Sequence, residues 1–465
     1  MRDRSCLGRA AAVGALVVAL AQSLVTAQDY YYPPAPYSHG IQDEVSSTTY
    51  RSRLNELEDR LAMLESQNSA DKEQEACQEV EIQTAPNHKL RGRLYFDQIW
   101  MNDLRGPGGV DTQENQTGFD TIRLGVAGNI YENLAYKAEF EFEGDEVDYK
   151  DIYGELGNLP WMGHFRIGYF KEPAGLEQMT SSRFISFMER SAPTVAFTPS
   201  RNLGIMFHHA MGARENWKWY AGLYRGQSED NDEDVDGDTN DWAGTFRVAG
   251  LPYYDQATPG RCLLHTGAWI SHRRTGDVGG TSGSGDWEGF LELDSRDGPI
   301  NVDLPADTEF NVMGLELGYM RGPFFIQNEH FFTHVSSVPG GLGFDCYGTY
   351  VTVGYFLTGE HRGYNKSNMA FDRVKPFEPF FWVRTADGTA AGLGAWEIAA
   401  RWSWLDLSDA TVATPGTQEN ITCGLNWYLN PYSRIVFNYV HSVSDVELAG
   451  KLEGDHFAVR FQIDW

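Results

Sequence analysis

The sequence lacks two features that would place it in common classes. After the N-terminus it has no apolar run of the roughly 18 residues that a membrane-spanning helix needs, which excludes a helical membrane protein. Positive charge is scarce, because 37 Lys and Arg stand against 65 Asp and Glu, giving a formal net charge of −28. Nucleic acid is therefore not expected as a partner. A membrane protein built from strands is still allowed.

Cysteine is also scarce, with five in 465 residues. Cys6 belongs to the N-terminal stretch, and the other four are too widely spaced for a metal-binding pattern. These four allow three disulfide pairings, which spacing cannot decide; they are Cys77, Cys262, Cys346 and Cys423. We interpret the last three as small strand residues. No metal and no cofactor is expected.

Residues 1–27 have the pattern of a secretory signal peptide. Arginines open the segment, an apolar core runs from Ala10 to Ala21, and Val25 to Ala27 form a small-residue cleavage site. The mature chain should therefore begin near Gln28, outside the cytoplasm.

The next residues predict three short regions before the main domain. Residues 28–49 are rich in Tyr and Pro and should be extended or disordered. Residues 50–68 carry Tyr50, Leu54, Leu57, Leu61 and Leu64 at alternating spacings of four and three, which predicts a short coiled coil. A single amphipathic helix is the alternative. Residues 69–89 are polar and should form a linker.

From residue 90 the apolar pattern changes to a period of two. In Leu134 to Glu143 the apolar residues alternate with Lys137, Glu139 and Glu141. Aromatic residues make up 13% of the chain although its mean hydropathy is negative, a combination typical of transmembrane barrels with a polar lumen. A soluble secreted β-protein is the alternative.

The alternation predicts sixteen strands, an even number that suits an antiparallel barrel. They are 90–101, 119–130, 133–143, 148–156, 163–171, 202–210, 216–226, 240–249, 262–273, 309–320, 323–333, 345–358, 393–405, 418–428, 432–443 and 453–465. A seventeenth near Phe377 to Arg384 is rejected because Pro376 and Pro379 would remove ladder donors. The links between the strands alternate between long external loops and short periplasmic turns. The link 359–392 is an exception, because it is long where a short periplasmic turn is expected.

The last strand ends on an aromatic residue. Phe457, Phe461 and Trp465 alternate with polar residues up to the end of the sequence. This ending resembles the assembly signal of bacterial outer-membrane barrels. It predicts an all-β transmembrane barrel in the bacterial outer membrane, with outer-membrane lipid as its surroundings.

Residues 90–465 resemble the phosphate-selective porin O and P family. Five short stretches carry the resemblance, namely Gly92 to Leu94, Gly175 to Arg190, Tyr355 to Glu360, Gly394 to Ile398 and Gly424 to Tyr428. The resemblance implies a sixteen-stranded, homotrimeric barrel whose third external loop folds inward. Here that loop is residues 171–200.

The resemblance also implies an anion site at the pore constriction. Arg93, Ser181, Ser182 and Arg190 match family positions, whereas paired arginines of the family fall on Asp120 and Thr121 and its loop lysine falls on Gln178. Arg123 and Arg183 could substitute for the missing cations. The alternative is that the loop arginines only anchor the loop to acidic wall residues.

Two other motifs give weaker signals. Asp232, Asp234, Asp236 and Gly237 begin a calcium-loop spacing, but the twelfth position is Ala243, so residues 229–241 are interpreted as a solvated acidic loop. His208 and His209 are neighbours in a strand, so they face opposite sides and cannot chelate together. No nucleophile motif indicates an enzyme.

We therefore predict a passive porin for small hydrophilic solutes, including phosphate or other oxyanions, with its constriction at residues 171–200. The alternative is a general pore that also anchors the envelope, reaching the cell wall through the coiled coil. The sequence leaves the charge selectivity open.

Overall fold

The computed structural model describes most of the chain from residue 86 onward. The described residues are 86–101, 115–143, 146–225, 242–258, 260–275, 286–289, 291–293, 298–337, 343–381, 383–385, 388–410, 414–447 and 449–465. The signal peptide, residues 28–49, the coiled coil at 50–68, Cys77, nearly all of the linker and the acidic loop 229–241 lie outside them. Among the described residues, no helix is both long and apolar enough to cross a membrane.

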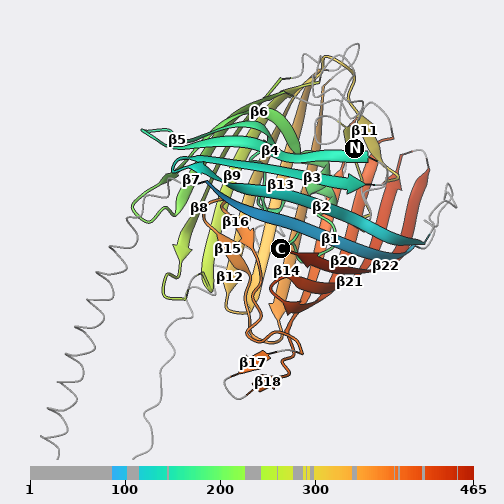
Figure 1. Cartoon of the computed structure of the whole chain (residues 1–465). Helices are drawn as coiled ribbons and strands as arrows, with labels where there is room; N and C mark the ends of the chain where they lie inside the picture. The colour runs from blue at the N-terminus through green and yellow to red at the C-terminus, as the bar shows by residue number, and fades with distance from the viewer. Residues whose placement is uncertain are drawn as a thin grey trace, which may run out of the picture. The chain divides into compact units, whose positions relative to one another are not determined.

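Sixteen antiparallel strands close into a barrel (Figure 1). In barrel order they are β1 (Asn87–Met101), β2 (Gln116–Tyr131), β3 (Leu134–Glu143), β4 (Glu146–Leu159), β5 (Gly163–Lys171), β6 (Arg201–Met211), β7 (Trp217–Arg225), β8 (Trp242–Tyr254), β9 (Cys262–Arg274), β12 (Glu309–Arg321), β13 (Phe324–Ser337), β14 (Phe344–Phe356), β19 (Ala395–Asp406), β20 (Gly416–Asn430), β21 (Ser433–Val446) and β22 (Gly450–Asp464). The predicted sixteen-stranded antiparallel barrel and its sixteen strands are confirmed, whereas the predicted coiled coil lies outside the described residues.

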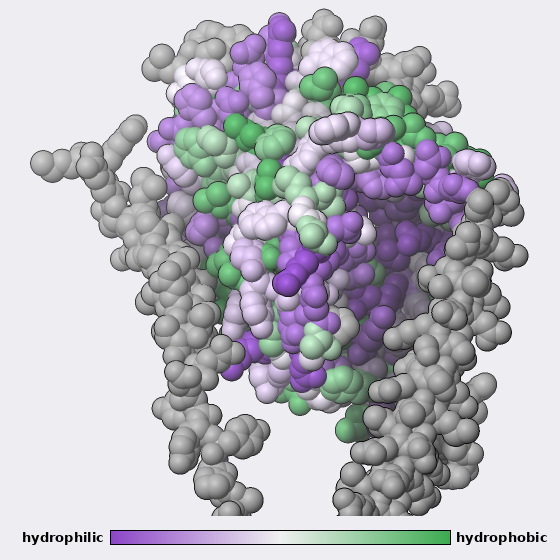
Figure 2. Space-filling model, turned by 90° about the vertical axis from the view of Figure 1, so that its left-hand side faces the viewer, coloured by the Kyte–Doolittle hydropathy of each residue, from purple (hydrophilic) through white to green (hydrophobic). Residues whose placement is uncertain are grey.

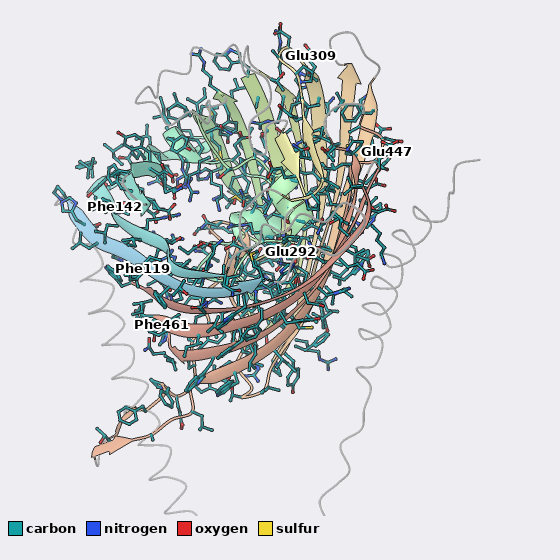
Figure 3. All side chains as sticks on the ribbon, turned by 90° about the vertical axis from the view of Figure 1, so that its right-hand side faces the viewer. Phe119, Phe142, Glu292, Glu309, Glu447 and Phe461 are labelled. Atoms are coloured by element: carbon teal, nitrogen blue, oxygen red, sulfur yellow. The ribbon has the colours of Figure 1, made fainter. Side chains whose placement is uncertain are left out.

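The two faces of the barrel wall differ as the alternation requires. On β3, Leu134 and Phe142 are exposed on the outside, whereas Glu139 and Glu141 are buried on the inside. In Figure 3, Glu292 lies within the ring of strands, and Phe119 and Phe461 lie along its wall. An apolar exterior and a polar interior suit a barrel surrounded by lipid.

The barrel closes between its first and last strands. β1 pairs with β22, and the backbones of Gly92 and Trp465 exchange hydrogen bonds of 3.2 and 3.0 Å. A Cβ on Gly92 would lie 2.2 Å from the Trp465 ring, so a larger residue there would force this half-exposed ring to shift. The aromatic ending therefore packs into the closing seam.

Among the described residues, three two-stranded sheets and two short helices lie outside the barrel sheet. They are β10 (Asp286–Glu288) with β11 (Asn301–Asp303), β15 (Gly363–Asn365) with β16 (Ala370–Asp372), β17 (Val383–Thr385) with β18 (Gly388–Ala390), α3 (Leu176–Met179) and α4 (Ala192–Phe197). The β17–β18 hairpin covers part of the rejected seventeenth strand and does not join the barrel, as Figure 1 shows.

The three described cysteines are free residues of barrel strands. Cys262 is partly exposed on β9, Cys346 is buried on β14 and Cys423 is exposed on β20. This agrees with their interpretation as small strand residues.

Candidate pore constriction

The segment between β5 and β6, residues 172–200, contacts the opposite wall of the barrel. Its backbone carbonyls accept hydrogen bonds from inward-facing side chains on β20, β21 and β22. The pairs are Asn426 to Ser186 at 2.7 Å, Arg434 to Ile185 at 2.7 Å, Gln462 to Arg183 at 3.1 Å and Arg460 to Met188 at 2.9 Å. These contacts place the segment within the lumen.

Helix α3 begins against a carboxylate of β13. Each oxygen of Glu329 accepts a 2.7 Å hydrogen bond, one from the backbone N–H of Leu176 and one from that of Glu177. Gly175 precedes them with φ of 75°, and a Cβ there would lie 2.8 Å from the Glu329 carboxylate. Glycine thus allows both the turn and the close approach of the wall residue.

A second inward segment, residues 291–293, is fastened to the same loop. Arg401 on β19 pairs with Glu177 at 3.2 Å and with Glu292 at 2.6 Å. Burial alone would raise the pKa of Glu292, but Arg401 and the hydroxyls of Ser403 and Thr422 lower it below its usual range. The carboxylate therefore stays charged and holds the loop against the wall.

A third segment enters from the end of the barrel that carries the short turns. Arg362 donates a 3.1 Å hydrogen bond to the carbonyl of Phe184 and lies 4.0 Å from the ring centre of Phe371. Leu176 of α3 packs in the same cluster as Phe371. The long link 359–392, which did not fit the alternation of loop lengths, thus folds partly into the lumen and supports residues 172–200.

The charged side chains of the lumen differ in exposure between the two sides of the barrel. On the wall of β19 and β22, Arg401 and Arg460 have side chains that are 0% and 3% exposed, whereas Lys150 on β4 is 21% exposed. The loop is partly exposed at residues 181–184, 189 and 190. The inward charged side chains of β4 and β5 are therefore more exposed than those of β19 and β22, and Arg166 on β5 is 20% exposed. Figure 2 shows a hollow in one face of the molecule that hydrophilic residues line.

Several of the residues predicted for the site do come together. Arg93 on β1 donates a 2.8 Å hydrogen bond to the hydroxyl of Ser182 and pairs with Glu139 at 3.1 Å. Arg183 donates to the hydroxyl of Ser181 at 3.2 Å and lies 3.7 Å from Asp464.

The other two predicted arginines have different surroundings. Arg123 on β2 pairs with Glu141 at 2.6 Å, which offsets its charge. Arg190 donates to the backbone carbonyls of Thr180 and Glu177, at 2.9 and 3.3 Å, rather than to a wall carboxylate. Burial lowers the pKa of Arg190, and burial together with Arg93 lowers that of Arg183 to about 10, so both guanidinium groups stay charged at neutral pH.

Lys171 and Arg201 flank the loop and were not predicted as anion-site residues, although Lys171 lies within the predicted constriction 171–200. The Nζ atom of Lys171 donates a 2.7 Å hydrogen bond to the carbonyl of Gln178. The positive charges of Arg190, Arg201 and Arg123 act on Lys171, and so does the negative charge of Asp151. Arg201 also pairs with Asp151 at 2.8 Å. The sequence could have indicated both residues, because Lys171 lies where β5 ends and Arg201 where β6 begins. Those two strand ends must border the loop that joins them.

On the other side of the loop, three carboxylates surround the guanidinium group of Arg460. Arg460 contacts Asp97 at 2.6 Å, Asp120 at 2.9 Å and Glu189 at 3.2 Å. Asp120, which stands where the family has an arginine, thus shares a cation with two other carboxylates. Burial raises the pKa of Glu189 to about 7, and the nearby Asp120 and Asp97 charges add to this effect.

A closed sixteen-stranded barrel with a polar lumen and segments folded into it is the architecture of an outer-membrane porin. The chain belongs to the family of phosphate-selective porins O and P, whose sequence profile matches residues 90–465. The protein is accordingly an outer-membrane porin, and the short-turn end of its barrel is the periplasmic end.

Individual relatives agree with this family. Porin O of Pseudomonas aeruginosa is 24% identical over 405 residues, which cover 80% of this chain and 87% of that protein. An uncharacterized protein of Caulobacter vibrioides is 26% identical over 360 residues, covering 76% and 67%. Among solved structures, the trimer form of OmpT, an outer membrane protein of Vibrio cholerae, has the same fold, with a TM-score of 0.50, 12% identity and coverage of 82% and 100%.

Proposed function

We propose that this porin is a homotrimer that prefers anions and binds phosphate or a similar oxyanion where residues 171–200 narrow the passage. The observation that carries the proposal is which groups Lys171 and Arg190 contact. In the part of the chain that the structure describes, both donate to backbone carbonyls and neither forms an ion pair. Their N–H groups therefore have no carboxylate in contact among the described residues.

Charge without a contacting counterion favours anions in a narrow passage. Unit charges about 4 Å apart interact by roughly 1 to 4 kcal/mol between bulk water and a protein surface. Arg123 and Arg201 add positive charge beside Lys171, although Glu141 and Asp151 offset part of it. A net preference for anions is expected.

Binding of an oxyanion needs several donors in addition to charge. Arg93 is buried and donates to the hydroxyl of Ser182, which is partly exposed. Lys171 and Arg190 supply further N–H groups. A tetrahedral oxyanion could replace the weaker contacts of these donors. The carboxylates of Glu139 and Glu141 compete for the same cations, so we expect moderate rather than tight binding.

The test is the reversal potential of purified protein in planar bilayers across a KCl gradient, with and without inorganic phosphate. We expect anion preference, current steps in groups of three, and partial block of chloride current by phosphate. Arg190→Gln should reduce both preference and block. Lys451→Gln is the matched control, because Lys451 lies on the outer face with a 61% exposed side chain.

The outcomes separate the two candidate functions. Equal permeability to both ions with no phosphate block would support the general pore. Cation preference would refute the proposal. The envelope-anchoring alternative depends on the coiled coil at 50–68, which is outside the described residues, and loss of envelope attachment on deleting residues 28–88 would test it.

A further inference from the structure

Three metal-ligating side chains meet on the inner face of the barrel near its periplasmic end. Glu155 is on β4, His164 on β5 and His208 on β6, and His164 stands directly opposite His208 in the strand register. His208 thus finds an imidazole partner on the neighbouring strand. His209, the next residue in sequence, points to the other face, as expected from the alternation of a strand.

The ligand atoms of this cluster converge. Nδ1 of His164 lies 3.1 Å from Oε1 of Glu155, and Nε2 of His208 lies 3.3 Å from Oε2. The two imidazole rings stack with centroids 4.8 Å apart and an angle of 13° between their planes. One ligand atom from each of the three residues lies within 4.8 Å of the others. A small rotation of the rings would bring all three atoms onto one ion.

We propose that Glu155, His164 and His208 bind one divalent transition-metal ion, of the kind represented by Zn²⁺ or Cu²⁺. Two imidazoles and one carboxylate form a ligand set that suits such ions and leaves a coordination position open. The side chain of His164 is 42% exposed, whereas those of Glu155 and His208 are 14% and 5% exposed. The ion would therefore enter from the lumen past His164 and keep a water or solute anion on its open side.

Arg166 is the internal competitor for this site. It pairs with Oε2 of Glu155 at 2.5 Å and lies 4.1 Å from the ring centre of Tyr153. Lys218 is also nearby, but its Nζ donates a 2.6 Å hydrogen bond to the carbonyl of Ser367. The metal would use Oε1, which faces His164, while Arg166 keeps Oε2. Removing the Arg166 charge should therefore tighten metal binding.

The experiment uses full-length protein without a polyhistidine tag, in detergent, titrated with Cu²⁺ and followed by electron paramagnetic resonance. We expect one equivalent of Cu²⁺ to bind, with a spectrum that shows superhyperfine coupling to two imidazole nitrogens. His164→Ala and His208→Ala should each weaken this binding by about 100-fold or more, because even the loss of an outer-shell partner costs roughly 10- to 100-fold. His209→Ala is the matched control and should bind like the wild type. Arg166→Gln should bind more tightly.

Each outcome bears on the proposal. The absence of a stoichiometric site in the wild type, or equal binding in His164→Ala and His208→Ala, would overturn it. Gel migration before and after heating verifies that each variant is a folded barrel, and His164→Gln provides a milder substitution. The copper signal does not depend on conductance, so failure of the anion-pore proposal would leave this result interpretable. If channels form, Zn²⁺ should shift the reversal potential towards anions in the wild type and not in His164→Ala.

Discussion

The Nζ atom of Lys171 lies 2.7 Å from the backbone carbonyl oxygen of Gln178. The amino group at the end of β5 thus lies beside the position where the family's loop lysine is replaced by glutamine. We propose that Lys171 takes the place of that lysine from a position seven residues earlier. This relationship makes Lys171 the first residue to test.

We expect Lys171→Gln to weaken phosphate block of chloride current by about tenfold or more, because one close charge contributes roughly 1 to 4 kcal/mol. The inhibition constant for phosphate in single-channel recordings measures this. Lys451→Gln should leave the constant unchanged. Unaltered block in Lys171→Gln would show that Lys171 only fastens the loop.

The pH dependence of selectivity should follow Glu189. Its pKa is raised to about 7, so its carboxyl is largely protonated at pH 6 and charged at pH 8. Removing negative charge favours anions, and anion preference should therefore rise as the pH falls through 7. Reversal potentials at pH 6 and pH 8 test the direction. Glu189→Gln should show the low-pH preference at both values, and a pH effect that persists in this variant would assign it to another group.

Breaking the anchor of the loop should destabilise the barrel. Arg401→Ala leaves Glu292 buried without its cation, and loss of one partner of a buried pair costs about 3 to 5 kcal/mol. Arg274→Ala is the control, because Arg274 and Asp307 have side chains that are 46% and 58% exposed, and such pairs contribute only about 0 to 1 kcal/mol. The temperature at which each variant unfolds, read from its heat-dependent migration on gels, measures the stability of both variants. Equal unfolding temperatures would contradict the anchoring role.

The free cysteines give a test of strand register. Cys423 is exposed on the outer face of β20 and Cys346 is buried inside. In liposomes, a lipid-soluble maleimide should modify Cys423, whereas a charged maleimide should not, and neither should modify Cys346. Peptide mass spectrometry identifies the labelled residue. Rapid labelling of Cys346 in the folded barrel would mean that the register of β14 is wrong.

The barrel itself could be predicted from sequence because its pattern is local. In Leu134 to Glu143 every second side chain is apolar, and a barrel in lipid requires this on every strand. The rejection of a barrel strand near Phe377 was also correct, since the prolines there cannot supply ladder donors. Strand ends were placed within a few residues because short turns fix them.

The interior of the lumen could not be predicted to the same extent. Glu292 and Arg362 lie in segments without periodicity, so nothing local indicates that they turn inward. The pairing of Arg460 with Asp97 joins residues 363 positions apart, and only closure of the sheet brings them together. The roles of Arg93, Ser181, Ser182, Arg183, Arg190 and Arg123 in selection stay predictions until conductance is measured.

The seam between Gly92 and Trp465 has a consequence for the kinetics of assembly. Most neighbouring strands of this barrel are joined by a turn or loop and can pair as soon as both exist, whereas β1 must wait for β22. Contacts between such distant residues are entropically costly and form late. A bulky residue at position 92 would collide with the Trp465 ring at this last step. Such a substitution should therefore slow folding much more than it alters the rest of the finished barrel.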